Sequence, residues 1–359
     1  MRMKRENSLD LMRVIAACSI VFFHSAGNLN TKFALGTDMS GAEMVTVLGL
    51  TFIAKAAVVL FLLVSGAFTL SSSALSDVRG HYRKTWKKLG IPTLIFSLVY
   101  LAQTFAVWME GIREGIDRFL YEPKEIASEL LKMLLKGETA SHLWYLYLLI
   151  ALYLMAPFLR KLLDMIGDHQ LLLSVILILW GWVSHMTADH YLTWDLGYAA
   201  ENTGIFMLGY VLHEKEKKSD AIRGAGHVFL FALILLFIHA AGFILFRSNA
   251  VLSVIFVPDT LSGLTALESG LIFVGFMRLR ISHDFGMPSS LTYGVYLIHP
   301  LVGSLVAAVW AGIMGISYFS VGDTVGTVFL YGAIICILSF IAVWLWKRLR
   351  RHSGRKREA

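Results

Sequence analysis

The stretch LDLMRVIAACSIVFFHS, residues 9–25, decides the fold class. It is apolar enough to enter a membrane, yet it contains Asp10, Arg13 and His24. On an α-helix, Arg13 and His24 differ by only about 20° around the axis and lie about 16 Å apart along it. Asp10 lies one turn before Arg13 and within roughly 60° of it. The three polar side chains therefore share one helix face, and that face must avoid lipid.

The composition indicates a membrane protein. Of the 359 residues, 57% are hydrophobic and only 16% are charged, and the mean hydropathy is +0.66. Apolar runs of roughly 20 residues, the length needed to cross a bilayer core, recur along the chain. Because lipid cannot satisfy backbone hydrogen bonds and the chain lacks the alternation of a β-barrel, we predict an all-α polytopic bundle. About ten transmembrane helices are expected, at 8–27, 44–70, 89–109, 142–159, 170–187, 200–213, 226–246, 259–278, 289–312 and 325–346.

The distribution of Lys and Arg predicts the orientation of these spans. When the connecting segments are assigned alternately to two sides, 23 basic residues lie on one side and 7 on the other. The basic side is expected to be cytoplasmic, which places both termini there. We therefore predict a transmembrane domain over residues 1–346 and a basic cytoplasmic tail over 347–359, close to anionic membrane lipids. The net charge of +7 then reflects topology and lipid contact, and no nucleic-acid partner is expected.

Several other kinds of site are not indicated by the sequence. Cys18 and Cys336 both fall in apolar segments, so no disulfide framework is implied. The chain has no GxxxxGK[ST] loop, no HExxH motif and no GxSxG motif. His185, Asp189 and His190 are too irregularly spaced to predict a metal site, and no metal is expected.

Two opposite charges fall in the middle of predicted spans. Lys55 interrupts LTFIAKAAVVLF, and Glu268 interrupts LSGLTALESGLIFVGF. Neither has an oppositely charged residue at the same depth on its own helix. They either form one ion pair across the bundle or line a cavity that binds a polar substrate or relays protons, and we favour the cavity.

A basic segment, HYRKTWKKLGIP, precedes the third predicted span. Arg83, Lys84 and Lys87 lie close together on it, with Trp86 among them. Such a run beside a membrane usually reports topology and lipid attraction. Clustered cations with an aromatic ring also suit a phosphorylated ligand that carries adenine.

Taken together, these motifs resemble those of the membrane acyltransferase-3 family over essentially the whole chain. The first span carries Asp-x-x-Arg followed by Arg-x10-His, the second ends FLLVSGAF with Ser65 and Gly66, and the basic segment continues into GIP. Two later stretches, HLWYLYLLIALYLMAPFLRKL and YGVYLIHPLV, carry the family's other matching positions, namely Trp144, Tyr153, Pro157, Tyr296 and His299. The basic segment departs from the family, which often shows paired arginines where lysines supply much of the charge here.

The resemblance implies an integral membrane O-acyltransferase of the bacterial cytoplasmic (inner) membrane. It would move an acetyl group from acetyl-CoA to a hydroxyl of an envelope glycan or exopolysaccharide, and the acceptor would be a glycan or a lipid-linked saccharide. The acceptor sugar, the choice of acetyl over another acyl group and the oligomeric state are not indicated by the sequence.

Within this hypothesis, His24 is the general base, or it accepts the acetyl group before passing it on. Arg13 positions CoA or closes the cavity, and Asp10 orients its guanidinium. The CoA phosphates are expected on Arg83, Lys84 and Lys87, with Ser65 also assigned to donor binding. Seven residues are expected to line the substrate cavity, although an aromatic belt or helix packing would also explain several of them: Lys55, Glu268, Trp144, Tyr147, Tyr198, Tyr296 and His299.

Two other classes of function fit parts of the pattern. Buried Lys55, Glu268 and His24 would suit a proton-coupled transporter or a component that translocates glycan, although the chain lacks the inverted repeat of broken helices typical of carriers. A non-catalytic scaffold for glycan synthesis would predict that replacing His24 has little effect.

Overall fold

The computed structural model describes residues 7–113, 123–187, 196–218, 224–249, 252–315 and 322–355. The chain forms two compact units. The first comprises Met1–Phe68 together with Asp168–Ala359, and the second comprises Thr69–Gly167. Each unit is described here by itself.

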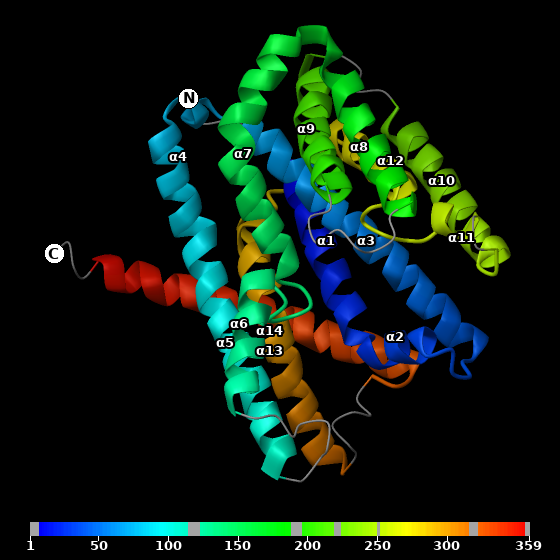
Figure 1. Cartoon of the computed structure of the whole chain (residues 1–359), viewed down its shortest axis with the longest axis vertical. Helices are drawn as coiled ribbons and strands as arrows, with labels where there is room; N and C mark the ends of the chain where they lie inside the picture. Colours follow the sequence, from blue (N-terminus) through cyan, green and yellow to red (C-terminus); the bar gives the residue numbers. More distant parts are fainter. Residues whose placement is uncertain are drawn as a thin grey trace. The chain divides into compact units, whose positions relative to one another are not determined.

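Throughout the described ranges, the regular secondary structure is helical (Figure 1). Each of the ten apolar segments predicted above coincides with a helix, to within a few residues at most of their ends. The helices are α1 (Asn7–Ser25), α2 (Gly27–Ala34), α3 (Gly41–Leu70), α4 (Val78–Thr85), α5 (Ile91–Arg113), α6 (Pro123–Lys136), α7 (Trp144–Ile166), α8 (Gln170–Thr187), α9 (Leu196–Lys218), α10 (Ala225–Phe246), α11 (Leu252–Ile255), α12 (Gly263–Arg278), α13 (Gly286–Met314) and α14 (Val325–Arg355).

The all-helical membrane architecture is confirmed, but fewer helices are clearly long and apolar enough to cross a bilayer than the ten predicted. Within the described ranges there are seven such stretches, and one of them, Trp144–His185, contains both α7 and α8. Two of the predicted spans, α9 and α12, are not among them. α12 has only 16 residues, and α9 ends in a charged run. The number of crossings and the cytoplasmic position of the termini stay predictions.

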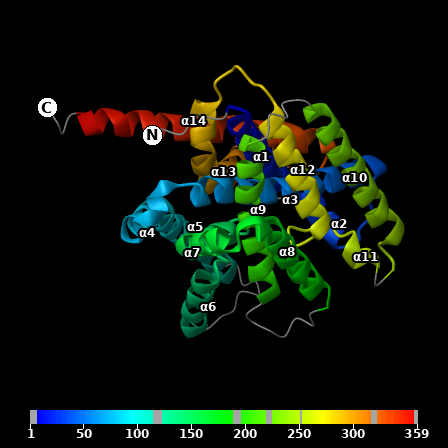
Figure 2. The ribbon, with the colours of Figure 1, turned by 90° about the horizontal axis from the view of Figure 1, so that it is seen from above.

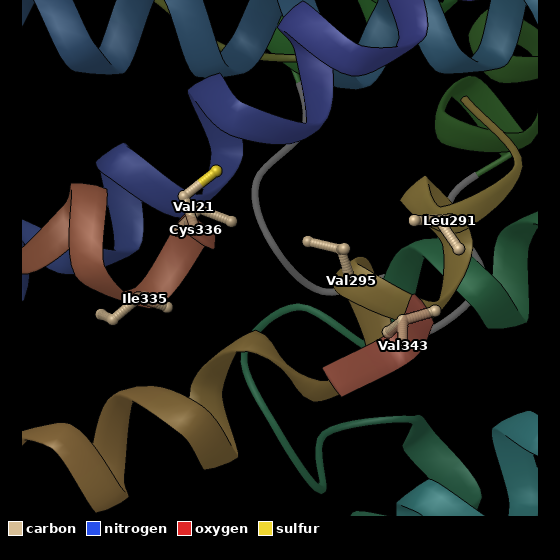
Figure 3. Close-up of a cluster of buried hydrophobic side chains, with 6 residues drawn as sticks. All are labelled: Val21, Leu291, Val295, Ile335, Cys336 and Val343. Atoms are coloured by element: carbon tan, nitrogen blue, oxygen red, sulfur yellow. The ribbon is translucent and has the colours of Figure 1, made fainter. Parts of the chain in front are cut away.

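The core of the first unit joins helices from the two ends of the chain. Val21 of α1 packs with Val295 of α13 and Ile335 of α14, together with Leu291, Cys336 and Val343 (Figure 3). The thiol of Cys336 lies 3.3 Å from that of Cys18, and both cysteines are free. This packing fixes the orientation of α1, the helix that carries Asp10, Arg13 and His24.

Glycines allow α3 and α9 of the first unit to approach at backbone distance. A β-carbon added to Gly66 would lie 1.8 Å from the carbonyl oxygen of Phe206. One added to Gly209 would lie 2.0 Å from the carbonyl oxygen of Leu63. The glycine of the Ser65-Gly66 pair is therefore required for helix packing, as small residues are at many contacts between membrane helices.

Replacing Gly66 with alanine is expected to destabilise the protein by about 1–3 kcal/mol, because the backbones of α3 and α9 must separate. Thermal unfolding of the detergent-solubilised protein measures the effect. Gly49→Ala on the same helix is the matched control, since a β-carbon there meets nothing within 4 Å. Equal melting temperatures for the two variants would contradict the close contact between α3 and α9.

Candidate functional site

The first half of the polar face of α1 is held in place by α13. The Arg13 guanidinium lies 3.3 Å from the Asp10 carboxylate, and the Ser289 hydroxyl donates a hydrogen bond of 2.6 Å to the same carboxylate oxygen. The Arg13 guanidinium also lies over the ring of Phe68, 4.7 Å from its centre. Asp10 is buried, whereas 28% of the Arg13 side chain is exposed. Asp10 thus holds the guanidinium of an arginine that is partly exposed.

At the other end of α1, His24 lies beside His299 of α13. The centres of the two imidazole rings are 5.2 Å apart. His24 is half-buried and His299 is buried, and Tyr296 packs with α1 and α3 one turn before His299. The structure therefore brings together three of the predicted residues, His24, Tyr296 and His299, in the first unit.

Pro300 determines how His299 is held. A proline has no N–H, so Pro300 leaves the carbonyl oxygen of Tyr296 without its helical hydrogen bond. Nδ1 of His299 lies 2.9 Å from that oxygen and 3.2 Å from the carbonyl oxygen of Val295. Because a carbonyl oxygen only accepts, Nδ1 carries the proton, and Nε2 is the acceptor atom of the neutral ring. The sequence YLIHP thus fixes both the tautomer and the orientation of the imidazole.

The same arrangement recurs in the second unit. Pro157 of α7 leaves the carbonyl oxygen of Tyr153 without its helical partner, and Nε2 of His81 lies 2.7 Å from this oxygen. The hydroxyl of Tyr82 donates to the carbonyl oxygen of the next residue, Leu154, at 3.0 Å. Together these bonds fasten α4, the start of the basic segment, to α7.

The cations of the basic segment are exposed. Arg83 and Lys84 end α4, and Lys87 lies in the π-helical turn Trp86–Gly90 that joins α4 to α5. The ring of Trp86 packs over Gly90, where a β-carbon would lie 2.3 Å from it. π-helical turns often occur at functional sites because they change which side chains face outward. The segment presents three cations and a half-exposed indole on a defined backbone, while Ser65 is half-buried on α3 of the other unit.

The two charges predicted within spans do not pair with each other. Nζ of Lys55 lies 3.1 Å from the carboxylate of Asp259, in the turn before α12. Oε1 of Glu268 lies 2.8 Å from Nδ1 of His239 on α10, and both of these residues are buried. The alternative of a single Lys55–Glu268 ion pair is therefore wrong, because each charge has a nearer partner that apolar patterning does not reveal.

The remaining predicted residues fall in both units. Tyr198, half-buried on α9, lies near enough to Asp259 of the first unit to feel its charge. Trp144 and Tyr147 begin α7 in the second unit, where the Tyr147 hydroxyl donates to the carbonyl oxygen of Leu134 at 3.1 Å and contacts that of Ser97. Tyr147 thus fastens α6 to α7, which favours the packing alternative for this residue.

Sequence patterns missed Asp259, His239, Ser289 and His81. The two histidine contacts with Tyr153 and Tyr296 had a signal in the sequence, because Tyr-x3-Pro leaves the tyrosine carbonyl oxygen without its helical N–H donor, which a nearby histidine can replace. Across the described residues, no group of three His, Cys, Asp or Glu side chains could hold a metal ion. Asp189 and His190 lie outside the described residues.

Of three comparisons with known proteins, one gives a match. No curated protein and no solved structure gives a significant match to the chain. A family model described as an acyltransferase domain matches residues 6–347, which include every residue of the polar face of α1, the basic segment and the YLIHP stretch. The chain therefore belongs to the acyltransferase-3 family and is a membrane acyltransferase.

Proposed function

We propose that the protein transfers an acetyl group from acetyl-CoA to a hydroxyl of an envelope glycan or exopolysaccharide at the bacterial inner membrane. The observation that carries the proposal is the pair of His24 and His299, a half-buried imidazole beside a buried one whose tautomer is fixed. The membrane acyltransferase family supports an acyl donor, and a neutral imidazole is a base that suits a hydroxyl acceptor.

In the proposed reaction, His24 removes the proton from the acceptor hydroxyl, and the hydroxyl oxygen attacks the thioester carbonyl carbon. The tetrahedral intermediate collapses with cleavage of the C–S bond, and the protonated imidazole returns the proton to the leaving thiolate. The products are an O-acetyl ester and free CoA. A variant of this route, in which His24 itself carries the acetyl group, uses the same residues.

Other side chains receive roles in donor binding. Arg13, held by Asp10, contributes a guanidinium with part of its surface exposed. The exposed cations Arg83, Lys84 and Lys87 suit the phosphates of CoA, and Trp86 suits its adenine, because a flat ring stacks on an indole. No metal is required for this chemistry.

Replacing Pro300 with alanine is expected to lower the transfer rate roughly tenfold to a hundredfold while leaving donor binding intact. The restored N–H would compete for the Tyr296 carbonyl oxygen and release the His299 imidazole from its fixed orientation, and small misplacements of catalytic groups cost rate of this order. Steady-state transfer is measured beside acetyl-CoA binding, with Pro288→Ala as the control, because this proline lies in the first turn of the same helix, where a missing N–H leaves no helical carbonyl without a donor. Unchanged transfer by Pro300→Ala would contradict the positioning role of His299.

A second candidate function is proton-coupled transport, which the buried pair of Glu268 and His239 favours. Purified protein in nanodiscs separates the two functions. An acetyltransferase binds acetyl-CoA and releases CoA thiol, because it transfers the acetyl group slowly to water even without its acceptor. If wild-type protein neither binds acetyl-CoA nor releases thiol, the proposed donor is wrong and the carrier becomes the better account.

A further inference from the structure

An apolar groove runs along the first unit between α8 and α12, with α9 at its base. Its volume is about 410 Å³, and every one of the 14 residues that line it is apolar or a glycine. On α8 the lining extends from Leu171 to Trp182, about 16 Å along the helix axis. The three helices lie side by side in Figures 1 and 2 and contact one another. The length and lining suit one hydrocarbon chain.

One end of the groove meets a polar cluster, which we define as Lys55, His185, Tyr198 and Asp259. His185 follows Trp182 by one helical turn, and Asp259 precedes the lining residue Gly263 by four residues. Asp259 is paired with Lys55 at 3.1 Å, and His185 lies close to it. The backbone N–H of Leu261 also donates to the Asp259 carboxylate, at 3.0 Å.

The exposure of this cluster indicates contact with a polar medium. About three-tenths of each side chain of the Lys55–Asp259 pair is exposed. An ion pair exposed to hydrocarbon would be costly, so this surface faces water or a polar ligand. A sugar ring suits it because each hydroxyl both donates to a carboxylate and accepts from an ammonium group. The phosphate of an anionic phospholipid would meet the Asp259 carboxylate as well as the Lys55 ammonium group.

Unsatisfied polar atoms lie at the same end of the groove. The hydroxyl of Ser262 and the indole N–H of Trp182 are buried, and neither makes a hydrogen bond within the described part of the chain. Ser262 is 1% exposed and immediately precedes the lining residue Gly263. Buried donors normally have partners, and an oxygen-rich headgroup would supply them.

The polar cluster lies at about the same depth in the first unit as His24, the proposed general base. Ala57 of α3 packs against Ala16 and Ile20 of α1. Lys55 is two residues from Ala57, and His24 follows Ile20 by one helical turn. Residues two apart point to nearly opposite sides of a helix, so Lys55 and His24 share a depth but lie on different sides of α3.

We propose that the groove and the polar cluster form one binding site for a lipid-linked saccharide, with its hydrocarbon chain between α8 and α12 and its sugar on Lys55, Asp259 and Tyr198. This inference rests on the proposed function for its biological meaning, since the bound molecule would be the acetyl acceptor. The binding itself does not require the transfer reaction, so it is tested without an acyl donor.

The experiment uses the full chain in nanodiscs and dodecyl glycosides of glucose, galactose and N-acetylglucosamine that carry bromine at the chain end. Bromine quenches indole fluorescence on contact, and the signal of Trp182 is obtained as the difference between wild type and Trp182→Phe. We expect saturable quenching of Trp182 by at least one glycoside. Gly270→Leu should weaken binding at least tenfold, because a β-carbon at Gly270 meets only Leu212, at 3.9 Å, so the new side chain occupies the groove.

One control variant and one variant of the polar cluster make the result specific. Gly312→Leu introduces the same side chain on α13, at a glycine with nothing within 4 Å, and should leave quenching unchanged. Asp259→Asn should weaken binding of the glycoside but not quenching by phosphatidylglycerol with brominated chains. The proposal is overturned if no glycoside quenches Trp182, or if brominated phosphatidylglycerol quenches it equally well and glycosides do not displace it. Saturable binding by a protein that shows no acetyl-CoA turnover would overturn the proposed reaction and leave this site standing.

Discussion

The His24→Ala variant is expected to bind acetyl-CoA like the wild type and to transfer its acetyl group about 10²–10⁴ times more slowly, the usual contribution of a positioned general base. The reason is that His24 is the half-buried member of the imidazole pair, while His299 is buried and its Nδ1 proton is committed to carbonyl oxygens. Binding is measured by calorimetry and transfer by release of CoA thiol in the presence of acceptor.

The matched control is His283→Ala, which removes an exposed imidazole between α12 and α13. It should retain wild-type transfer. Wild-type transfer by His24→Ala would contradict the assignment of the base and would favour the scaffold or carrier. Loss of acetyl-CoA binding by His24→Ala would instead assign His24 to the donor site.

The second large effect is expected from Arg83→Ala/Lys87→Ala. Removing two exposed cations should weaken acetyl-CoA binding roughly tenfold or more, since charge-assisted hydrogen bonds to phosphate are among the stronger polar contacts. The difference in affinity between wild type and variant should be smaller at high ionic strength, because salt screens the attraction that the wild-type cations exert on phosphate. Acetyl-CoA titrations at two salt concentrations measure both effects.

Lys215→Ala/Lys218→Ala is the control, because it removes the same charge from exposed positions at the end of α9. It should bind acetyl-CoA like the wild type. If the two double variants bind equally well, the basic segment serves topology and lipid contact alone, which is the simpler explanation of its composition.

Much of the fold is predictable from the sequence because it depends on local patterns. Apolar runs specify the helices, and Arg-x10-His on one helix specifies a shared face, since both follow from the period of the α-helix. Even so, α14 continues to Arg355, beyond the predicted end at 346. The lysines and arginines that follow the apolar run are good helix formers. An apolar pattern predicted that α9 and α12 cross the membrane, but α9 ends in charged residues and α12 has only 16 residues. Neither is among the helices that are clearly long and apolar enough to do so.

The partners of the polar side chains are less predictable because they come from distant parts of the chain. Asp10 receives its hydrogen bond from Ser289, and Lys55 pairs with Asp259, more than 200 residues away in each case. His239 lies in the middle of the apolar run of α10, and a single imidazole there gives no indication of Glu268 as its partner. The binding roles of the basic segment and the polar cluster are chemical proposals built on this geometry.

The most direct test of the account uses inverted membrane vesicles that contain the protein, supplied on the cytoplasmic side with acetyl-CoA labelled in the acetyl group. The glycan fraction is isolated, and its label is released by mild alkali, which cleaves O-acetyl esters. We predict alkali-labile label on the glycan with wild-type protein and its loss with His24→Ala. Unlabelled glycan from wild-type vesicles in which the thioester is consumed and acceptor is present would contradict transfer to a glycan hydroxyl.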